Sequence, residues 1–141
     1  MAGPIVPPRH YDDAAKLLLR VALAVLLLLH GYAKLINGID GIAGALAGRG
    51  WPAQAAYLVY AGELIAPLLI LFGIWTRLAA LVIAINMVVA IALMHMQQLA
   101  TLGDTGGWAL ELQGFYLAAA LALALQGAGR YSVAGPGGRW N

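Results

Sequence analysis

The sequence contains no cysteine and few charged residues. Only 8 Lys and Arg and 6 Asp and Glu occur among its 141 residues, so 10% of the chain is charged, compared with roughly a quarter in soluble domains. Without cysteine the chain can form no disulfide, thiolate metal site, cysteine-held iron–sulfur cluster or dithiol exchange site. The basic residues are too few and too scattered to predict binding to a nucleic acid.

Apolar residues, by contrast, make up most of the chain. They account for 62% of it, and the mean hydropathy is +0.83. Four segments reach the roughly 20 residues that a helix needs to cross a bilayer: about 17–36, 55–75, 78–96 and 108–126. We therefore expect an all-α fold, a bundle of four transmembrane helices in a single domain over residues 1–141. Flexible tails are expected at 1–12 and 134–141.

The first apolar segment follows Lys16 and could therefore be a cleaved signal peptide. Its continuation, HGYAKLING, offers no convincing cleavage site formed by small residues. This favours a helix that is retained in the membrane.

Basic residues predict the orientation of the helices, because Lys and Arg are enriched in cytoplasmic loops. Six of the eight fall on one side of the membrane: Arg9, Lys16, Arg20, Arg77, Arg130 and Arg139. Lys34 and Arg49 fall on the other side. We therefore expect a multi-pass protein of the bacterial inner membrane with both termini in the cytoplasm. Arg20, early in the first helix, is expected to extend its side chain to the lipid headgroups.

Ionisable side chains gather at one level of the predicted bundle, in the outer third of the membrane. The first helix brings His30 and Lys34, and the later three bring Glu63, His95 and Glu111 in turn. Charged groups inside a membrane are costly and usually functional. The sequence therefore predicts a polar pocket between the helices.

Helical spacing places aromatic residues beside the two acids. Tyr60 precedes Glu63 by three residues, and Trp108 and Phe115 flank Glu111 at three and four residues, so each group shares one helix face. We expect these aromatic residues to form walls of the pocket and to contact a substrate.

Pro67 follows Glu63 by four residues in the second helix. Proline has no N–H and its ring crowds the carbonyl four residues earlier, which here belongs to Glu63. A kink is therefore expected beside the acid, with a free carbonyl that opens the pocket. Asn86, half a turn round the third helix from His95, is expected to lie outside the cluster and to join helices.

The cluster suits several kinds of chemistry. Carboxylic acids, imidazoles and an amine can together hold and pass protons, as a quinone head group requires on reduction. Two His and two Glu are also ordinary metal ligands, but the chain lacks a Glu-x-x-His pair on one helix, so no metal site is predicted. A structural role is the third interpretation, because polar contacts also join membrane helices.

The order and spacing of several motifs resemble the DoxX family of bacterial and archaeal membrane proteins, from about Leu17 to Val133. The matching stretches include LLLRVALAVLLLLHGYAKL, GELIAPLLILFGIWTRLAAL, MVVAIALMH and GGWALELQGFYLAAALALAL. The resemblance implies a four-helix membrane bundle. It also implies family motif positions at the following residues: His30, Gly31, Lys34, Glu63, Thr76, Arg77 and His95.

Some members of this family are subunits of thiosulfate:quinone oxidoreductase, and others are linked to quinone or oxidative-stress handling. This chain has no haem-attachment, flavin or iron–sulfur motif, so redox activity would need a bound quinone or a redox partner subunit. We therefore expect a quinone-binding membrane subunit of an oxidoreductase. In it, Glu63 and Glu111 would exchange protons, and His30 and His95 would bind the head-group oxygens. Lys34 would offset an acid and could attract an anionic substrate from the outer side.

A different class of function is also open. The chain could be a non-enzymatic membrane anchor or assembly partner for another protein or a second copy. In that case the polar cluster would fix the fold or bind a metal. A pathway for ions or solutes is disfavoured, because the cytoplasmic half of the predicted bundle is apolar.

Overall fold

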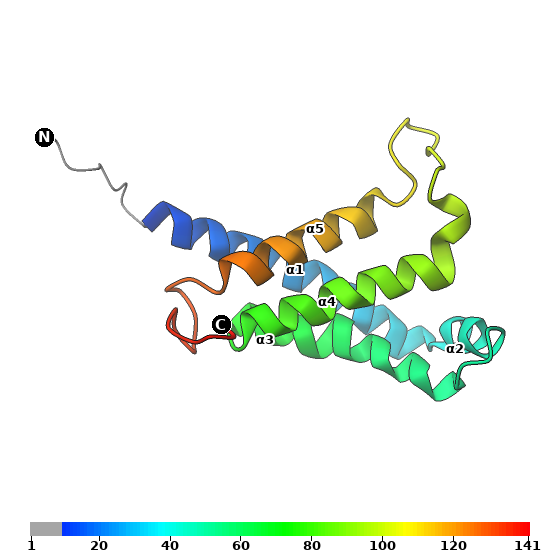
Figure 1. Ribbon diagram of the computed structural model, residues 1–141, viewed down its shortest axis with the longest axis horizontal. Helices are drawn as coiled ribbons and strands as arrows, with labels where there is room; N and C mark the ends of the chain where they lie inside the picture. The colour runs from blue at the N-terminus through cyan, green and yellow to red at the C-terminus, as the bar shows by residue number, and fades with distance from the viewer. Residues whose placement is uncertain (1–9) are drawn as a thin grey trace, which may run out of the picture.

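The computed structural model describes residues 10–141, which form the expected all-α protein (Figure 1). Three helices are long and apolar enough to cross a membrane: His10–Asn37, Ala53–Phe72 and Thr76–Gln98. They correspond to the first three predicted segments, so the protein is a multi-pass membrane protein by its helix composition.

The first long helix is α1 (His10–Asn37), and the other two are composite. The second joins a 3₁₀ segment (Ala53–Leu58), a π-helical segment (Ala61–Ile65) and α3 (Ala66–Phe72). The third consists of α4 (Thr76–Ala90), a π-helical segment (Ile91–His95) and a 3₁₀ turn (Met96–Gln98).

The fourth predicted segment is shorter than expected. Its helix, α5 (Glu111–Gln126), has 16 residues and is therefore about 24 Å long, less than the roughly 30 Å of a bilayer core. Residues 99–110 form a loop between α4 and α5 (Figure 1). α5 packs mainly against α4 and also contacts α1.

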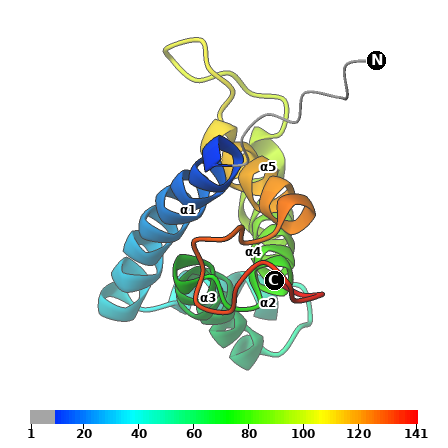
Figure 2. The ribbon, with the colours of Figure 1, turned by 90° about the vertical axis from the view of Figure 1, so that its left-hand side faces the viewer.

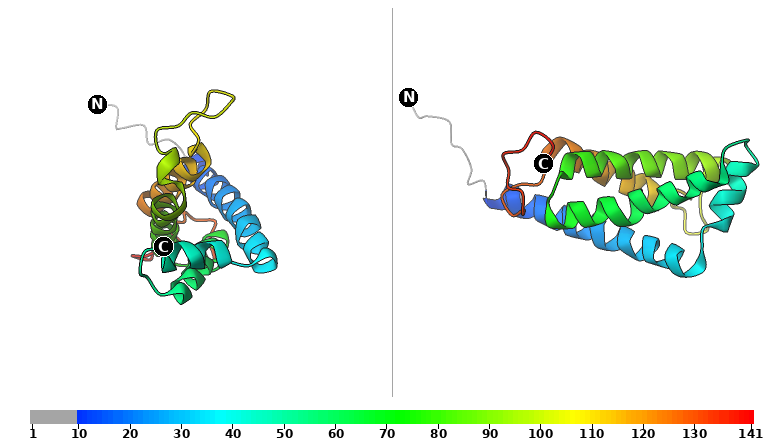
Figure 3. Two further views of the ribbon diagram at one scale, coloured as in Figure 1. Left: turned by 90° about the vertical axis from the view of Figure 1, so that its right-hand side faces the viewer. Right: turned by 90° about the horizontal axis from the view of Figure 1, so that it is seen from below.

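The short helix α2 (Asp40–Ala47) lies across the end of the bundle where α1 finishes (Figure 3). It contacts the 3₁₀ segment that starts the second long helix, as well as the π-helical end of the third. We call this the α2 end of the bundle. α1 begins, and the chain finishes, at the opposite end (Figure 1).

The buried apolar side chains form one continuous core between α1, α3, α4 and α5. Alanines supply much of it on the two helices that pack most closely: Ala79, Ala80 and Ala84 on α4, and Ala119 and Ala120 on α5. Small residues let helix backbones approach closely, which is how helices associate in lipid without a hydrophobic driving force.

The last residues of the chain lie against the start of α4. Asn141 is buried, and its Oδ1 accepts hydrogen bonds from the backbone N–H and the hydroxyl of Thr76 at 3.2 and 3.0 Å. The N–H of Arg77 donates to the carbonyl of Trp140 at 2.9 Å. Residues 134–141, expected as a flexible tail, cross the end of the bundle in Figure 2, with Asn141 buried and most of the others exposed. Of the other expected tail, residues 1–9 lie outside the described part and 10–12 belong to α1.

Arg20 is buried to 1% exposure, so the prediction that it reaches the headgroups is wrong. Its guanidinium donates to Ile70 O at 2.9 Å and Leu71 O at 3.0 Å, near the end of α3. It also donates to Ala128 O at 2.9 Å and Tyr131 O at 2.7 Å, beyond the end of α5. The last carbonyls of a helix lack partners and carry partial negative charge, so they stabilise the buried cation.

Gly73 makes room for this arrangement. It ends α3 with φ of 70°, a conformation that glycine adopts without strain. A Cβ at this position would lie 2.5 Å from Nη2 of Arg20 and 2.3 Å from Cβ of Ser132. The sharp turn and the buried guanidinium therefore both depend on glycine here.

Replacing Arg20 with methionine should destabilise the protein strongly, because four carbonyl oxygens lose their donor inside the bundle. We expect a loss of about 3 kcal/mol, measured as a lower midpoint of thermal unfolding in a mild detergent. Arg139→Met is the matched control, because Arg139 is exposed. Equal midpoints for the two variants would contradict the structural role of Arg20.

Candidate functional site

A cavity of about 210 Å³ lies between the long helices and α5, toward the α2 end. Polar groups from all four helices reach it, and four of the residues that the sequence predicted for the pocket are among them: His30, Lys34, Glu63 and His95. The other lining residues are Leu27, Met87, Ala90, Leu112, Gln113 and Tyr116.

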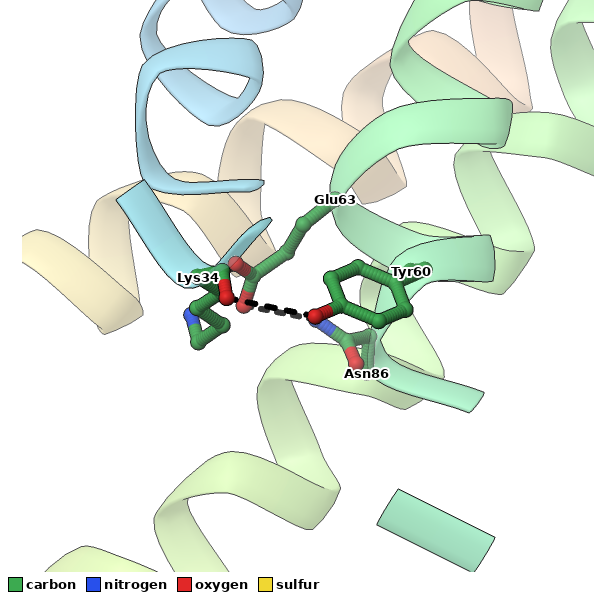
Figure 4. A network of polar contacts seen from close by, with 4 residues as sticks. All are labelled: Lys34, Tyr60, Glu63 and Asn86. Carbon is green, nitrogen blue, oxygen red and sulfur yellow. Dashed lines mark hydrogen bonds and ion pairs between the residues drawn. The ribbon is translucent and has the colours of Figure 1, made fainter. Parts of the chain in front are cut away.

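Glu63 is the buried acid of this cavity, with 5% exposure. Its Oε2 forms an ion pair with Nζ of Lys34, and its Oε1 accepts a hydrogen bond from Nδ2 of Asn86 at 3.4 Å (Figure 4). The hydroxyl of Tyr60 donates to the carbonyl of Lys34 at 3.2 Å. The negative charge is thus compensated by a cation, and both carboxylate oxygens are occupied.

The contact of Asn86 with Glu63 corrects the expectation that Asn86 lies outside the cluster. α4 passes very close to the second helix at Gly62, where a Cβ would lie 2.4 Å from Cγ of Asn86. Asn86 therefore reaches the carboxylate from a different side than the one facing His95. The expectation rested only on the angle between Asn86 and His95 around their helix. That angle carries no information on the distance between α4 and the second helix, which Gly62 makes short.

Pro67 acts through a π-helical turn. The N–H of Ala66 donates to the carbonyl of Ala61, five residues earlier, whereas an α-helix bonds four residues earlier. The wider turn accommodates the proline and includes Glu63 within it. His95 also lies in a π-helical turn. Such turns are rare and often occur at functional sites.

Pro67 has no N–H and cannot donate a hydrogen bond to the carbonyl of Glu63, four residues earlier. This carbonyl faces Gly31 of α1. A Cβ on Gly31 would lie 2.5 Å from this oxygen and 2.6 Å from Cδ2 of Leu64. Glycine thus allows α1 and the π-helical turn to approach at the level of the ion pair. The closeness of these backbones explains how Lys34, one turn later on α1, reaches Glu63.

Arg49, in the connection after α2, holds the other π-helical turn. Its Nη2 donates to Leu93 O at 2.9 Å and contacts Ala92 O at 3.5 Å, and its Nη1 donates to Ala45 O at 3.2 Å. It therefore links α2 to the turn that presents His95. The Nδ1 of His95 lies 3.2 Å from Oε1 of Gln98.

The predicted face of the fourth helix does not reach the cavity. Phe115 is 74% exposed, and Glu111 is an exposed residue whose carboxylate lies against Gly107. Trp108 lies in the preceding loop, where its Nε1 donates to Leu99 O at 2.9 Å. The reason is that α5 begins only at Glu111, so the spacing from Trp108 does not follow one helix.

Gln113 and Tyr116 line the cavity instead. The rings of Tyr116 and His30 meet edge to face, with centroids 5.9 Å apart and planes at 77°. The sequence signal for them is a pair of polar residues three apart on an otherwise apolar helix. Uncharged residues of this kind stand out less in a membrane segment than a glutamate does, so the prediction missed them.

The described residues offer little for a metal ion: across 10–141, no group of three or more His, Asp and Glu side chains is arranged to hold one. The cavity instead presents imidazoles, a phenol and a carboxamide next to a compensated carboxylate. Such groups can hydrogen-bond to an oxygen-bearing ligand and exchange protons with it.

Comparison with known proteins now identifies the family. The sequence matches the DoxX family over residues 15–96. The chain belongs to the DoxX family. The match includes every motif position that the resemblance implied, but α5 lies outside it.

One curated relative has a name that describes a redox enzyme. The chain is 33% identical over 79 residues to a Bacillus subtilis (strain 168) protein named "Putative oxidoreductase CatD", and the match covers 56% of this chain. It covers 58% of that relative, so the chain spans a little over half of its length. No solved structure matches the chain.

Replacing Gly31 with alanine should separate α1 from the π-helical turn, because the added methyl group would overlap the carbonyl of Glu63. We expect a loss of about 2 kcal/mol in unfolding free energy. Gly44→Ala is the control, since no atom lies within 4 Å of its added Cβ. Thermal unfolding of both variants in the same detergent tests this, and a Gly31→Ala variant as stable as Gly44→Ala would contradict the close approach.

Proposed function

We propose that this DoxX protein binds the head group of a quinone or quinol in the cavity and acts as the membrane subunit of an oxidoreductase. The observation that supports this best is a cavity with ring-sized volume, lined by proton-exchanging groups from four helices. Its 210 Å³ exceeds the roughly 150 Å³ in which a protein can hold a benzene ring. The name of the Bacillus subtilis relative is in keeping with a redox role.

In this proposal the lining residues divide the tasks. His30 and His95 bind the head-group oxygens, and Glu63 holds a proton-exchanging position that Lys34 balances. A quinone accepts two electrons and two protons, and the electrons would come from a redox partner, because the chain carries no motif for a redox centre of its own. Glu111, Trp108 and Phe115 lie away from the cavity, so we assign them no contact with the ligand.

We further propose that α5 crosses the membrane as a fourth span and that both termini face the cytoplasm of a bacterial inner membrane. α5 lies alongside α4 within the bundle, and its 16 residues can span where the bilayer thins locally. The α2 end then faces outward, and the end with Arg77 and Arg130 faces inward, in agreement with the enrichment of basic residues in cytoplasmic loops.

One observation favours a second function. Both oxygens of Glu63 are already engaged by Lys34 and Asn86, as in a purely structural polar contact. In that case the protein would be a membrane anchor or assembly partner, and the network would fix the packing of three helices.

Glu63→Gln distinguishes these functions by native mass spectrometry in a mild detergent. The wild type should carry an adduct with the mass of a quinone, and the variant should lose most of it, because the amide cannot pair with Lys34 or exchange a proton. Glu111→Gln is the control and should keep the adduct. A folded wild type without any adduct, or a Glu63→Gln variant that keeps it, would count against quinone binding at this site.

Labelling of single cysteines tests the topology, and the absence of native cysteine makes it direct. Gln54→Cys and Asp104→Cys should react with a membrane-impermeant maleimide in intact cells. Gly138→Cys should react only after the cells are permeabilised. If Asp104→Cys and Gly138→Cys label from the same side, α5 does not span the membrane.

A further inference from the structure

Tyr116 is the buried polar residue of the cavity that the sequence did not single out. It is 6% exposed and comes from α5, opposite His30 of α1. On α5 it continues the buried stripe of Ala119, Ala120 and Leu123. A phenylalanine ring would pack in this stripe equally well, so packing does not explain why the residue carries a hydroxyl.

The hydroxyl of Tyr116 forms no hydrogen bond with any residue between 10 and 141, although Tyr116 lines the same cavity as the engaged carboxylate of Glu63. Within this range, every fully buried side-chain nitrogen or oxygen atom has a partner. The Tyr116 oxygen is therefore not sealed in the core but opens into the cavity that it lines. A buried tyrosine hydroxyl normally finds a partner, and here the open direction leads to the ligand site.

Two of the neighbouring polar side chains, Glu63 and His95, already have partners within the protein. Glu63 is engaged by Lys34 and Asn86 on its two oxygens, and His95 lies beside Gln98. The edge-to-face contact with His30 holds the phenol ring without using its oxygen. A hydroxyl is both a donor and an acceptor, so it can serve a ring carbonyl as well as a ring hydroxyl.

We propose that the Tyr116 hydroxyl hydrogen-bonds directly to an oxygen atom on the ring of the bound head group. It donates to the carbonyl of the oxidised ring and accepts from the hydroxyl of the reduced ring. This assignment rests on the proposed quinone binding and adds to it a contact from α5, which lies outside the matched family region. His30 and Tyr116 then meet the head group from α1 and α5 as an adjacent pair.

Tyr116→Phe tests the assignment, because it removes one oxygen atom and keeps the ring against His30. Binding of decylubiquinone to the purified protein in nanodiscs should weaken about 3- to 10-fold, the usual effect of one neutral hydrogen bond. Tyr32→Phe is the control, because Tyr32 is on α1 with 61% exposure, and its binding should equal the wild type.

Infrared difference spectra give a readout that a structural role would not change. On binding to the wild type, the quinone C=O stretch should move to lower frequency, and the C–O band of ring-labelled tyrosine should shift with it. In Tyr116→Phe the tyrosine shift should be absent and the C=O shift smaller, because His30 and His95 still bind the head group. Tyr32→Phe should show both shifts in full. The chain has 6 tyrosines, so loss of the tyrosine shift in Tyr116→Phe together with its retention in Tyr32→Phe assigns the shifted band to Tyr116.

The outcomes separate the two proposals. Equal affinity and an unchanged C=O shift in Tyr116→Phe would overturn the role of Tyr116, while quinone binding by the wild type would stand. Absence of decylubiquinone binding to the folded wild type would overturn both. Weaker binding, a smaller C=O shift and loss of the tyrosine shift support the direct contact.

Discussion

A carboxylate buried among apolar helices must be neutralised, and the site of this protein is organised around that need at Glu63. Lys34 supplies the opposite charge and Asn86 a hydrogen bond, so two other helices are tied to the second one at this level. These helices can approach only where a residue has no side chain, as at Gly31 and Gly62. The polar contacts of Glu63 therefore depend on the two glycines, which let the helices approach. With an apolar residue in place of Glu63, Lys34 and Asn86 would lose their partner.

The two ends of the bundle handle buried charge in different ways. Arg20 is held by backbone carbonyls near the end of α3 and beyond α5, and none of these four partners is an acid. Glu63 is held by side chains and leaves a cavity beside it. Carbonyls at helix ends surround the guanidinium, which suits a fixed joint. Side chains around a carboxylate leave space, which suits exchange with a ligand.

The sequence predicted much of this, because long apolar runs and costly charges are local signals. The first three membrane helices and the meeting of His30, Lys34, Glu63 and His95 could be inferred from hydropathy and spacing, and the family from the resemblance of the motifs. The features that could not be inferred depend on contacts between distant segments. Arg20 looked like a headgroup contact, since nothing in its neighbourhood reveals the carbonyls near Ile70 and Ala128 that receive it. The face of α5 was misjudged because the start of that helix is set by the loop before it.

The two π-helical turns have a consequence for comparing relatives. Each such turn holds one residue more than an α-helical turn, because its hydrogen bond reaches back five residues instead of four. A relative with one residue fewer in AGELI could form a plain α-helix there with the same faces on both sides, because the wider turn absorbs its additional residue. Length differences of a single residue at these turns therefore leave the flanking faces in place, whereas an ungapped alignment across them would pair residues that face different neighbours.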